Sequence, residues 1–311
     1  MEISLTNVHL DLGAGKRGTD MGPSAIQLAG LVPKIESLGH QVESIQSLGV
    51  QHFDALDPVD AGARFINEIS ETCRQIAART EAAVDAGRVP LVIGGDHSQA
   101  IGTIAGMARA LRKRDEKLGV LWVDAHTDMN TPGSSPSGNI HGMPLAALLG
   151  RGRDQLVSIA GETPALEPEN VVIMGARDVD ATEVPLVKEL GVRVYTMHEI
   201  DSRGASVCIK EAIEHIQKNT AGIHLSFDLD GVDPAHAPGV GTPVPGGLSL
   251  RESHLLCESV ASTGKLLGME MVELNPILDN QNVTGELAVW LILSALGKRI
   301  LGDTASPRSV K

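Results

Sequence analysis

Val89-Pro90-Leu91-Val92-Ile93-Gly94-Gly95-Asp96-His97 is the stretch of sequence that indicates the fold. Its first five residues are all apolar and end at two glycines, which is typical of a strand buried on both faces of a parallel sheet. An acid and a histidine follow at once. Because ligands of open α/β sheets bind beyond the carboxyl ends of the strands, the stretch also predicts a polar site at one edge of the sheet.

The same pattern recurs along the chain. Further apolar runs that we interpret as strands are 3–10, 42–48, 119–123, 171–174, 223–227 and 267–272. Stretches that we interpret as helices are 60–86, 99–112, 205–217, 251–262 and 284–300, and Pro23 marks the start of an earlier helix. Strands that alternate with helices predict an α/β fold with three layers, α/β/α, around a mostly parallel sheet. Because no repeat, linker or change of composition interrupts the chain, residues 1–311 are expected to form a single domain.

The composition argues against several classes of function. Acidic residues outnumber basic ones 39 to 26, for a net charge of −13, and aromatic residues make up only 2%, so a nucleic acid is an improbable partner. We find no apolar run of about 18 residues and no secretory signal, and therefore expect no membrane span. The three cysteines (Cys73, Cys208 and Cys257) are odd in number and far apart, which favours a reduced, cytoplasmic protein.

The polar residues after three of the predicted strands are of types that bind metal ions. They are His97, Asp124, His126, Asp128, Asp228 and Asp230. In two of the groups the residues are spaced by two, so on an extended backbone their side chains can face a common point. Four crowded carboxylates resist ionisation unless cations compensate their charge, and we therefore expect a pair of divalent ions. Carboxylate and imidazole ligands suit Mn²⁺ better than a structural Zn²⁺, although Zn²⁺ and Co²⁺ stay open as occupants.

Three motifs are similar to the signature motifs of the ureohydrolase family. They are GGDHS at 94–98, DAHTD at 124–128 and SFDLDGVDP at 226–234. Within the family the chain most resembles the arginases, through SGNIHGMP at 137–144, the N-terminal segment 16–23 and ELNPILD at 273–279. The similarity extends from about residue 5 to about residue 300.

The resemblance implies the ureohydrolase fold, two Mn²⁺ ions per subunit and the hydrolysis of L-arginine to L-ornithine and urea by a hydroxide that bridges the ions. The implied ligands are His97, Asp124, Asp128 and Asp228 for one ion, and Asp124, His126, Asp228 and Asp230 for the other. A guanidinium carbon is a poor electrophile, so the reaction needs a strong nucleophile. Two metal ions can supply one by lowering the pKa of a bridging water.

The resemblance also assigns residues to the substrate and to catalysis. Glu273 would anchor the guanidinium, for which a carboxylate is a matching partner. His141 would move a proton, and Asp128 would be needed for the rate as a direct metal ligand. The remaining implied substrate contacts are Asn130, Ser137 and Asn139 at the α-carboxylate, Asp180 and Glu183 at the α-amino group, and Thr242 near the guanidinium.

Other interpretations of the sequence stay open. An agmatinase or a guanidinobutyrase would share the metal motifs but lacks the loop at 137–141. A non-catalytic metal-binding homologue would normally have lost a ligand, whereas this chain keeps all six. A binuclear metallophosphatase is disfavoured, because its usual Gly-Asn-His-Asp/Glu segment is missing. Asp180 and Glu183 could also simply cap a helix. Arg251 and Glu252 resemble a pair that links subunits in many arginases, which implies a homo-oligomer, either a trimer or a hexamer.

Overall fold

The computed structural model describes residues 1–50, 60–161 and 164–301, and within these ranges its centre is one eight-stranded sheet. The strand order is β2-β1-β3-β8-β7-β4-β5-β6, and every neighbouring pair is parallel. The strands are β1 (Glu2–His9), β2 (Gln41–Gly49), β3 (Val89–Ile93), β4 (Leu118–Val123), β5 (Val171–Ala176), β6 (Arg193–Thr196), β7 (Gly222–Asp228) and β8 (Leu266–Val272).

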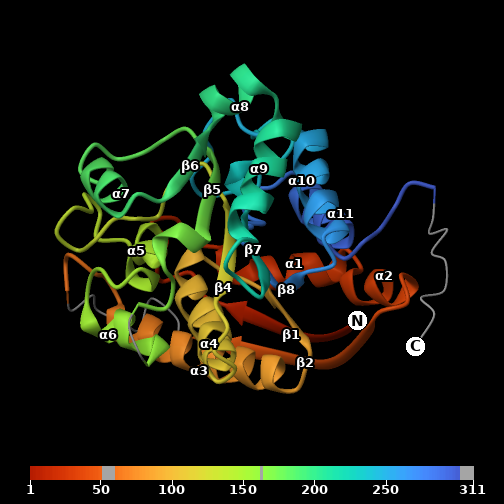
Figure 1. Cartoon of the computed structure of the whole chain (residues 1–311), viewed down its shortest axis with the longest axis horizontal. Helices are drawn as coiled ribbons and strands as arrows, with labels where there is room; N and C mark the ends of the chain where they lie inside the picture. The colour runs from red at the N-terminus through yellow and green to blue at the C-terminus, as the bar shows by residue number, and fades with distance from the viewer. Residues whose placement is uncertain (51–59, 162–163, 302–311) are drawn as a thin grey trace.

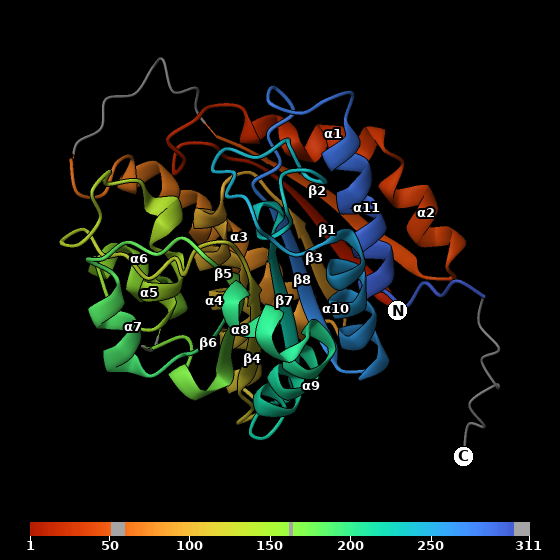
Figure 2. The ribbon, with the colours of Figure 1, turned by 90° about the horizontal axis from the view of Figure 1, so that it is seen from above.

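Helices cover both faces of this sheet, as Figure 1 and Figure 2 show. One face carries α3 (Ile66–Asp85), α4 (Ala100–Arg112), α5 (Pro144–Leu148), α6 (Asp154–Val157) and α7 (Val184–Leu190). The other carries α1 (Gly22–Leu28), α2 (Leu31–Ser37), α8 (Met197–Arg203), α9 (Ala205–Ile216), α10 (Leu250–Ser262) and α11 (Val283–Ala295). The predicted three-layer α/β/α fold with a mostly parallel sheet is confirmed.

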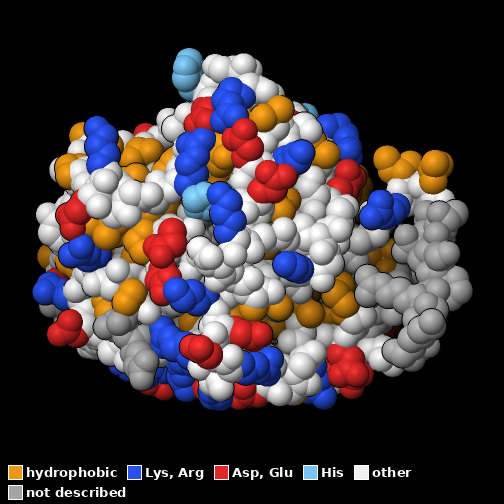
Figure 3. Space-filling view, in the orientation of Figure 1, with side chains coloured by type: hydrophobic (Ala, Val, Ile, Leu, Met, Phe, Trp, Pro, Cys, Tyr) orange, Lys and Arg blue, Asp and Glu red, His pale blue; other side chains and the backbone are white. Residues whose placement is uncertain are grey.

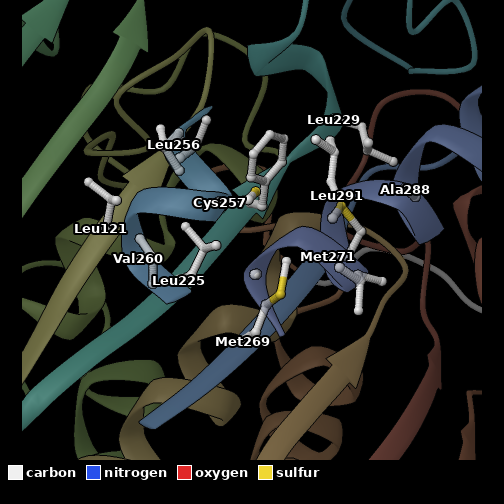
Figure 4. Close-up of a cluster of buried hydrophobic side chains, with 14 of the residues drawn as sticks. Leu121, Leu225, Leu229, Leu256, Cys257, Val260, Met269, Met271, Ala288 and Leu291 are labelled. Atoms are coloured by element: carbon white, nitrogen blue, oxygen red, sulfur yellow. The ribbon is translucent and has the colours of Figure 1, made fainter. Parts of the chain in front are cut away.

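Alternation of side chains along the strands divides the apolar core into two halves. In β4, Leu121 and Val123 belong to the half under α8–α11, whereas Val120 and Trp122 belong to the half under α3–α7. Figure 4 shows the first half, in which leucine and methionine side chains of β4, β7 and β8 meet Leu256 and neighbouring residues of α10. Burial of one such leucine stabilises the fold by roughly 1.5–3 kcal/mol.

The structure corrects the expected bounds of two helices. The helix predicted to begin at residue 60 begins at Ile66, because the Asp60 carboxylate accepts a hydrogen bond from the Gly62 amide and Phe65 takes a left-handed backbone conformation, with φ of 56°. The last helix ends at Ala295 rather than at residue 300, and Gly297 follows with φ of 97°. The short elements β6, α2, α7 and α8 were not expected.

Two further expectations concern the whole chain. Among the described residues, the structure contains no helix with both the length and the apolarity required to cross a membrane. Figure 3 shows basic and acidic side chains interspersed over one face of the molecule, so neither sign of charge dominates there. The expectation of a single domain over residues 1–311 stays a prediction.

Candidate active site

The carboxyl ends of four adjacent strands bring the predicted metal ligands together. Strands β3, β8, β7 and β4 are neighbours in the sheet, and each ends in a polar segment at the same edge. His97 begins a short 3₁₀ turn after β3, and Asp228 ends β7. The sheet order thus brings residues that are far apart in sequence into one cluster.

His97 is the centre of the first group. Its Nδ1 lies 3.1 Å from Asp124 Oδ2, 3.0 Å from Asp128 Oδ2 and 3.2 Å from Asp228 Oδ2. Yet within the described chain neither His97 Nδ1 nor Asp128 Oδ2 has a partner in hydrogen-bond geometry, although both atoms are buried. Buried polar atoms are normally satisfied. Three carboxylate oxygens that approach one imidazole nitrogen without forming hydrogen bonds to it are arranged as they would be around a cation.

Asp124 links this group to a second one. His126 Nδ1 lies 3.3 Å from Asp124 Oδ1 and 3.2 Å from Asp230 Oδ2. One ligand atom from each of His97, Asp124 and Asp228 lies within 4.8 Å of the other two, and the same holds for Asp124, His126 and Asp230. Asp124 therefore presents one oxygen to each group, as a bridging ligand would. A bridging role for Asp228, which the structure places in the first group, stays a prediction.

The electrostatics of the two groups fit a pair of divalent cations. Burial, and then the neighbouring Asp124, raises the pKa of Asp128 to about 7. Burial and adjacent carboxylates also raise the pKa values of Asp228 and Asp230. Burial opposes ionisation of Asp124 as well, but His126 and His97 outweigh it and lower its pKa. The negative charge of four buried carboxylates exceeds the positive charge that two imidazoles can carry. Carboxylate oxygens together with imidazole nitrogens are a donor set suited to divalent metals.

Backbone strain is concentrated in two of the site residues. Asp128 has φ of 52° and Glu273 has φ of 65°, values that are uncommon for residues other than glycine. Hydrogen bonds hold both conformations: the Asp128 carbonyl accepts from the Leu145 amide at 3.1 Å, and the Glu273 amide donates to the Gly95 carbonyl at 2.9 Å. Such strained residues cluster at functional sites, where the surrounding structure compensates their cost.

Glu273 and His141 form a buried ion pair beside the metal ligands. His141 Nδ1 donates to Glu273 Oε1 at 2.9 Å, and the same oxygen accepts from the His97 amide at 2.9 Å. Burial lowers the pKa of His141, but Glu273 outweighs burial and raises it to about 9. The other oxygen, Glu273 Oε2, is buried and has no hydrogen-bond partner among the described residues. It is a free acceptor for a cationic group.

A cavity of about 200 Å³ opens over these groups and is lined by the predicted substrate contacts, Asn130, Ser137, Asn139, Asp180, Glu183 and Thr242. Asn130 donates to Asp180 at 2.9 Å, and Thr242 donates to Asp230 at 2.9 Å. Glu183 is nearly buried, and one of its oxygens accepts from the Met129 amide at 2.5 Å. The structure therefore gathers all six at the cavity, while their contacts with a substrate stay predictions.

Sequence reasoning missed two residues that shape the site. The Trp122 indole stacks on the His97 ring, with centroids 4.1 Å apart, and donates to Asp124 Oδ2 at 3.0 Å. Alternation along β4 was an available signal, since Trp122 lies two residues before Asp124. Arg177 donates to the carbonyl of Asp230 at 2.7 Å and to that of Val244 at 2.6 Å, and so ties together two loops of the site.

Arg251 and Glu252, the residues expected to link subunits, both have partners in their own chain. Arg251 is exposed and lies 3.2 Å from Glu258. Glu252 forms a capping box with Ser249 at the start of α10, in which each side chain bonds the backbone amide of the other residue. The expected subunit contact stays a prediction.

Comparison with known proteins connects this geometry to a family. The model of the arginase family matches residues 1–297. An arginase of Brevibacillus brevis is 49% identical over 302 residues, which cover 96% of this chain and 99% of that protein. Crystal structures of arginases from Bacillus cereus and Bacillus caldovelox are each 45% identical, superpose with TM-scores of 0.91, and cover 96% of this chain and 100% and 99% of theirs. The chain therefore belongs to the arginase family of hydrolases, as its motifs indicated.

Proposed function

We propose that this protein hydrolyses L-arginine to L-ornithine and urea and that it binds two Mn²⁺ ions per subunit. The observation that carries the proposal is the pair of His/Asp groups, joined through Asp124, beside an acid-lined cavity. Three relatives that are 46–49% identical to this chain are each named arginase, which supports arginine as the substrate.

The metal ions would be held by two sets of ligands that share members. His97, Asp124, Asp128 and Asp228 would hold one ion, and Asp124, His126, Asp228 and Asp230 the other. When bound, such a pair lowers the pKa of a water molecule and so supplies a nucleophile near neutral pH. Thr242 orients Asp230 through a hydrogen bond to the same oxygen that faces His126.

Glu273 and His141 would handle the reacting end of the substrate. Glu273 Oε2, which is buried and unpaired within the described residues, would accept a hydrogen bond from the guanidinium. His141, with its raised pKa, holds a proton on its imidazole at neutral pH. It would pass that proton towards the leaving amine, whose departure requires protonation.

The acids and amides of the cavity favour an amino acid over a simple amine as the substrate. Asp180 and Glu183 would face the α-ammonium, and Asn130, Ser137 and Asn139 would bind the α-carboxylate. Agmatine carries no α-carboxylate and would leave these donors without a partner. This difference argues against agmatinase. Guanidinobutyrate keeps a carboxylate but has no α-ammonium group, so it would leave Asp180 and Glu183 without a cationic partner, which argues against guanidinobutyrase.

The proposal is tested by measuring urea release from the purified, Mn²⁺-loaded protein with arginine and agmatine side by side. We expect kcat/KM for arginine to exceed that for agmatine by at least about a hundredfold, which is about 3 kcal/mol of discrimination. Comparable values for both substrates would refute the substrate assignment. A protein that holds two Mn²⁺ ions but releases no urea would instead be a non-catalytic homologue.

We also propose that the protein is a cytoplasmic homo-oligomer, either a trimer or a hexamer, in which Arg251 and Glu252 contact a second subunit. Arg251 is exposed, although it also pairs with Glu258 of its own chain. Light scattering after size-exclusion chromatography tests the assembly, since a monomer at micromolar concentration would contradict it. Arg251→Ala is expected to shift the protein towards smaller species.

A further inference from the structure

A fully buried polar group lies beneath His97, on the side of its ring that faces away from the metal ligands. His97 Nε2 lies 2.9 Å from Ser226 Oγ, and Ser226 in turn donates to Glu270 Oε1 at 2.9 Å. Ser226 and Glu270 are direct partners in the register of β7 and β8. None of the three side chains is more than 1% exposed. Sequence analysis quoted Ser226 as the first residue of a motif but gave it no role, and it did not single out Glu270, although an acid within an otherwise apolar strand was a signal.

Glu270 is surrounded by hydrogen-bond donors. Besides Ser226, His224 Nε2 lies 3.2 Å from Oε1, and the Gln99 amide donates to Oε2 at 3.5 Å. Burial raises the pKa of Glu270, but His224 outweighs burial and lowers it below its ordinary value. Because Ser226, His224 and Gln99 all present donors to its two oxygens, Glu270 is the acceptor of this group, as a carboxylate is.

The direction of the hydrogen bonds follows from counting hydrogens. A serine hydroxyl has a single hydrogen, and here it is donated to the Glu270 carboxylate. Ser226 can then only accept from His97, so His97 Nε2 carries a hydrogen. A metal-bound imidazole is neutral, so with Nε2 protonated the lone pair would lie on Nδ1, the nitrogen that faces Asp124, Asp128 and Asp228. A metal-binding imidazole needs this tautomer.

We propose that Glu270 is a positioning residue that acts through Ser226 to hold His97 with its Nδ1 lone pair directed at the metal ion. This inference rests on the metal binding proposed above. Trp122, stacked on the His97 ring, fixes the plane of the imidazole, and Glu270 fixes which nitrogen is free. Partners of metal-bound histidines elsewhere perform this task, and their loss weakens metal binding about 10–100-fold.

Two variants interrupt the arrangement at different points. Ser226→Ala removes the hydroxyl between His97 and Glu270. Glu270→Met keeps the length of the side chain but offers no carboxylate to Ser226, whose hydrogen can then turn to His97 Nε2. In each variant, metal-free protein titrated with Mn²⁺ should bind one of the two ions about 10–100-fold more weakly, as measured by equilibrium dialysis with elemental analysis. The double variant should bind no more weakly than Ser226→Ala alone, because both changes act along one path.

A rescue variant and a control separate positioning from simple structural support. Glu270→Gln keeps an acceptor oxygen for Ser226, and Gln99 can turn its own amide oxygen, which is buried and has no partner among the described residues, towards the new amide. We expect it to bind Mn²⁺ as the wild type does. The matched control is Thr103→Val, which changes a fully buried residue of α4 whose hydroxyl adjoins Glu270 and donates to the Gln99 carbonyl. It should lower Tm and leave Mn²⁺ affinity unchanged.

Several results would overturn the inference. They are wild-type Mn²⁺ affinity in Ser226→Ala or in a folded Glu270→Met, additive losses in the double variant, no rescue by glutamine, and an equal loss in Thr103→Val. If Glu270→Met does not fold, Ser226→Ala decides alone. A wild-type protein that binds no Mn²⁺ would refute the proposed function itself. Normal wild-type binding with unaffected variants would refute only the role of Glu270.

Discussion

Asp128 has a backbone conformation and an environment that are both unfavourable for an ionised aspartate. Its backbone is left-handed, and its carboxylate is buried next to Asp124, which raises its pKa to about 7. Both features disfavour the folded state at neutral pH. A side chain that is held in this way, with an unpaired buried oxygen 3.0 Å from His97 Nδ1, is explained by a cation that it binds.

Asp128→Asn tests this explanation. The amide keeps the shape of the side chain but removes the charge, so one Mn²⁺ should be lost and kcat should fall by at least about a hundredfold. Steady-state kinetics and the metal content per subunit check both effects. Asp178→Asn is the matched control, because Asp178 lines the same cavity but belongs to neither ligand group. A fully active Asp128→Asn protein with two ions would contradict the assignment.

Replacement of His141 should lower turnover without affecting metal binding. The Nδ1 atom of His141 contacts Glu273, which is not a proposed metal ligand. His141→Ala should therefore lower kcat by about 10²–10⁴-fold while the metal content stays at the wild-type value. Elemental analysis of the purified variant is the decisive measurement. Loss of a metal ion from this variant would place His141 among the ligands instead.

The His141–Glu273 pair also predicts a dependence of stability on pH. The folded-state pKa of about 9 lies above the ordinary value of 6.5, so the pair stabilises the fold fully below pH 6.5, and its contribution is lost as pH rises through 9. In metal-free protein, the wild type should exceed His141→Asn in unfolding free energy by up to about 3 kcal/mol at pH 6. Urea denaturation at pH 6 and pH 10 checks this. An advantage that grows with pH would contradict the pairing.

At the scale of elements, the sequence predicted the buried strands well and the exposed elements poorly. Strand β3 has the predicted bounds, because a wholly apolar run stopped by two glycines has few other interpretations. Strand β6 has only four residues, Arg193–Thr196, most of them partly exposed at the edge of the sheet, and it gives no such pattern. The helix expected from residue 60 begins late, because Asp60 and Phe65 form a turn first. Such local competition is decided by contacts that the sequence does not display.

Gly95 is the residue through which these elements form the site. Its amide donates to the Val8 carbonyl and its carbonyl accepts from the Glu273 amide, so it joins the ends of β1, β3 and β8. A Cβ at this position would overlap the Leu10 backbone oxygen. Gly95→Ala should therefore destabilise the fold by about 1–3 kcal/mol and weaken Mn²⁺ binding. Gly49→Ala, at the end of β2, is the control, because no atom of the described residues lies within 4 Å of a Cβ added there. Equal Tm values for the two variants, measured calorimetrically, would contradict this account.

At the scale of the whole molecule, the site depends on the order of the strands. The His97 amide and Glu273 meet although 176 positions separate them in sequence. From the sequence we could predict which residues follow buried strands, and hence the ligand types. The order β3-β8-β7-β4 could not be predicted, because it depends on how all the helices pack on both faces. For the same reason, the sequence assigned a role to His97 but none to Ser226 and Glu270 beneath it.

The stability of the whole molecule should depend on its metal ions. With the ions removed by a chelator, four buried carboxylates repel one another, so Tm should fall and should recover when Mn²⁺ is restored. The pKa of Asp128 predicts how the stability of the metal-free protein changes with pH. Its folded-state pKa of about 7 exceeds the ordinary 3.8, so in metal-free protein it increasingly destabilises the fold as pH rises from 4 to 7.

Metal-free Asp128→Asn should therefore be more stable than metal-free wild type at pH 8, by up to about 4 kcal/mol, and the difference should vanish near pH 4. With saturating Mn²⁺ the order should reverse, because the variant has lost a ligand and gains less from binding. Thermal denaturation of both proteins, with chelator and with Mn²⁺, measures all four states. If the chelator leaves the wild-type Tm unchanged, or if the variant is the less stable protein in both conditions at pH 8, then the carboxylates are not held together for the sake of a cation.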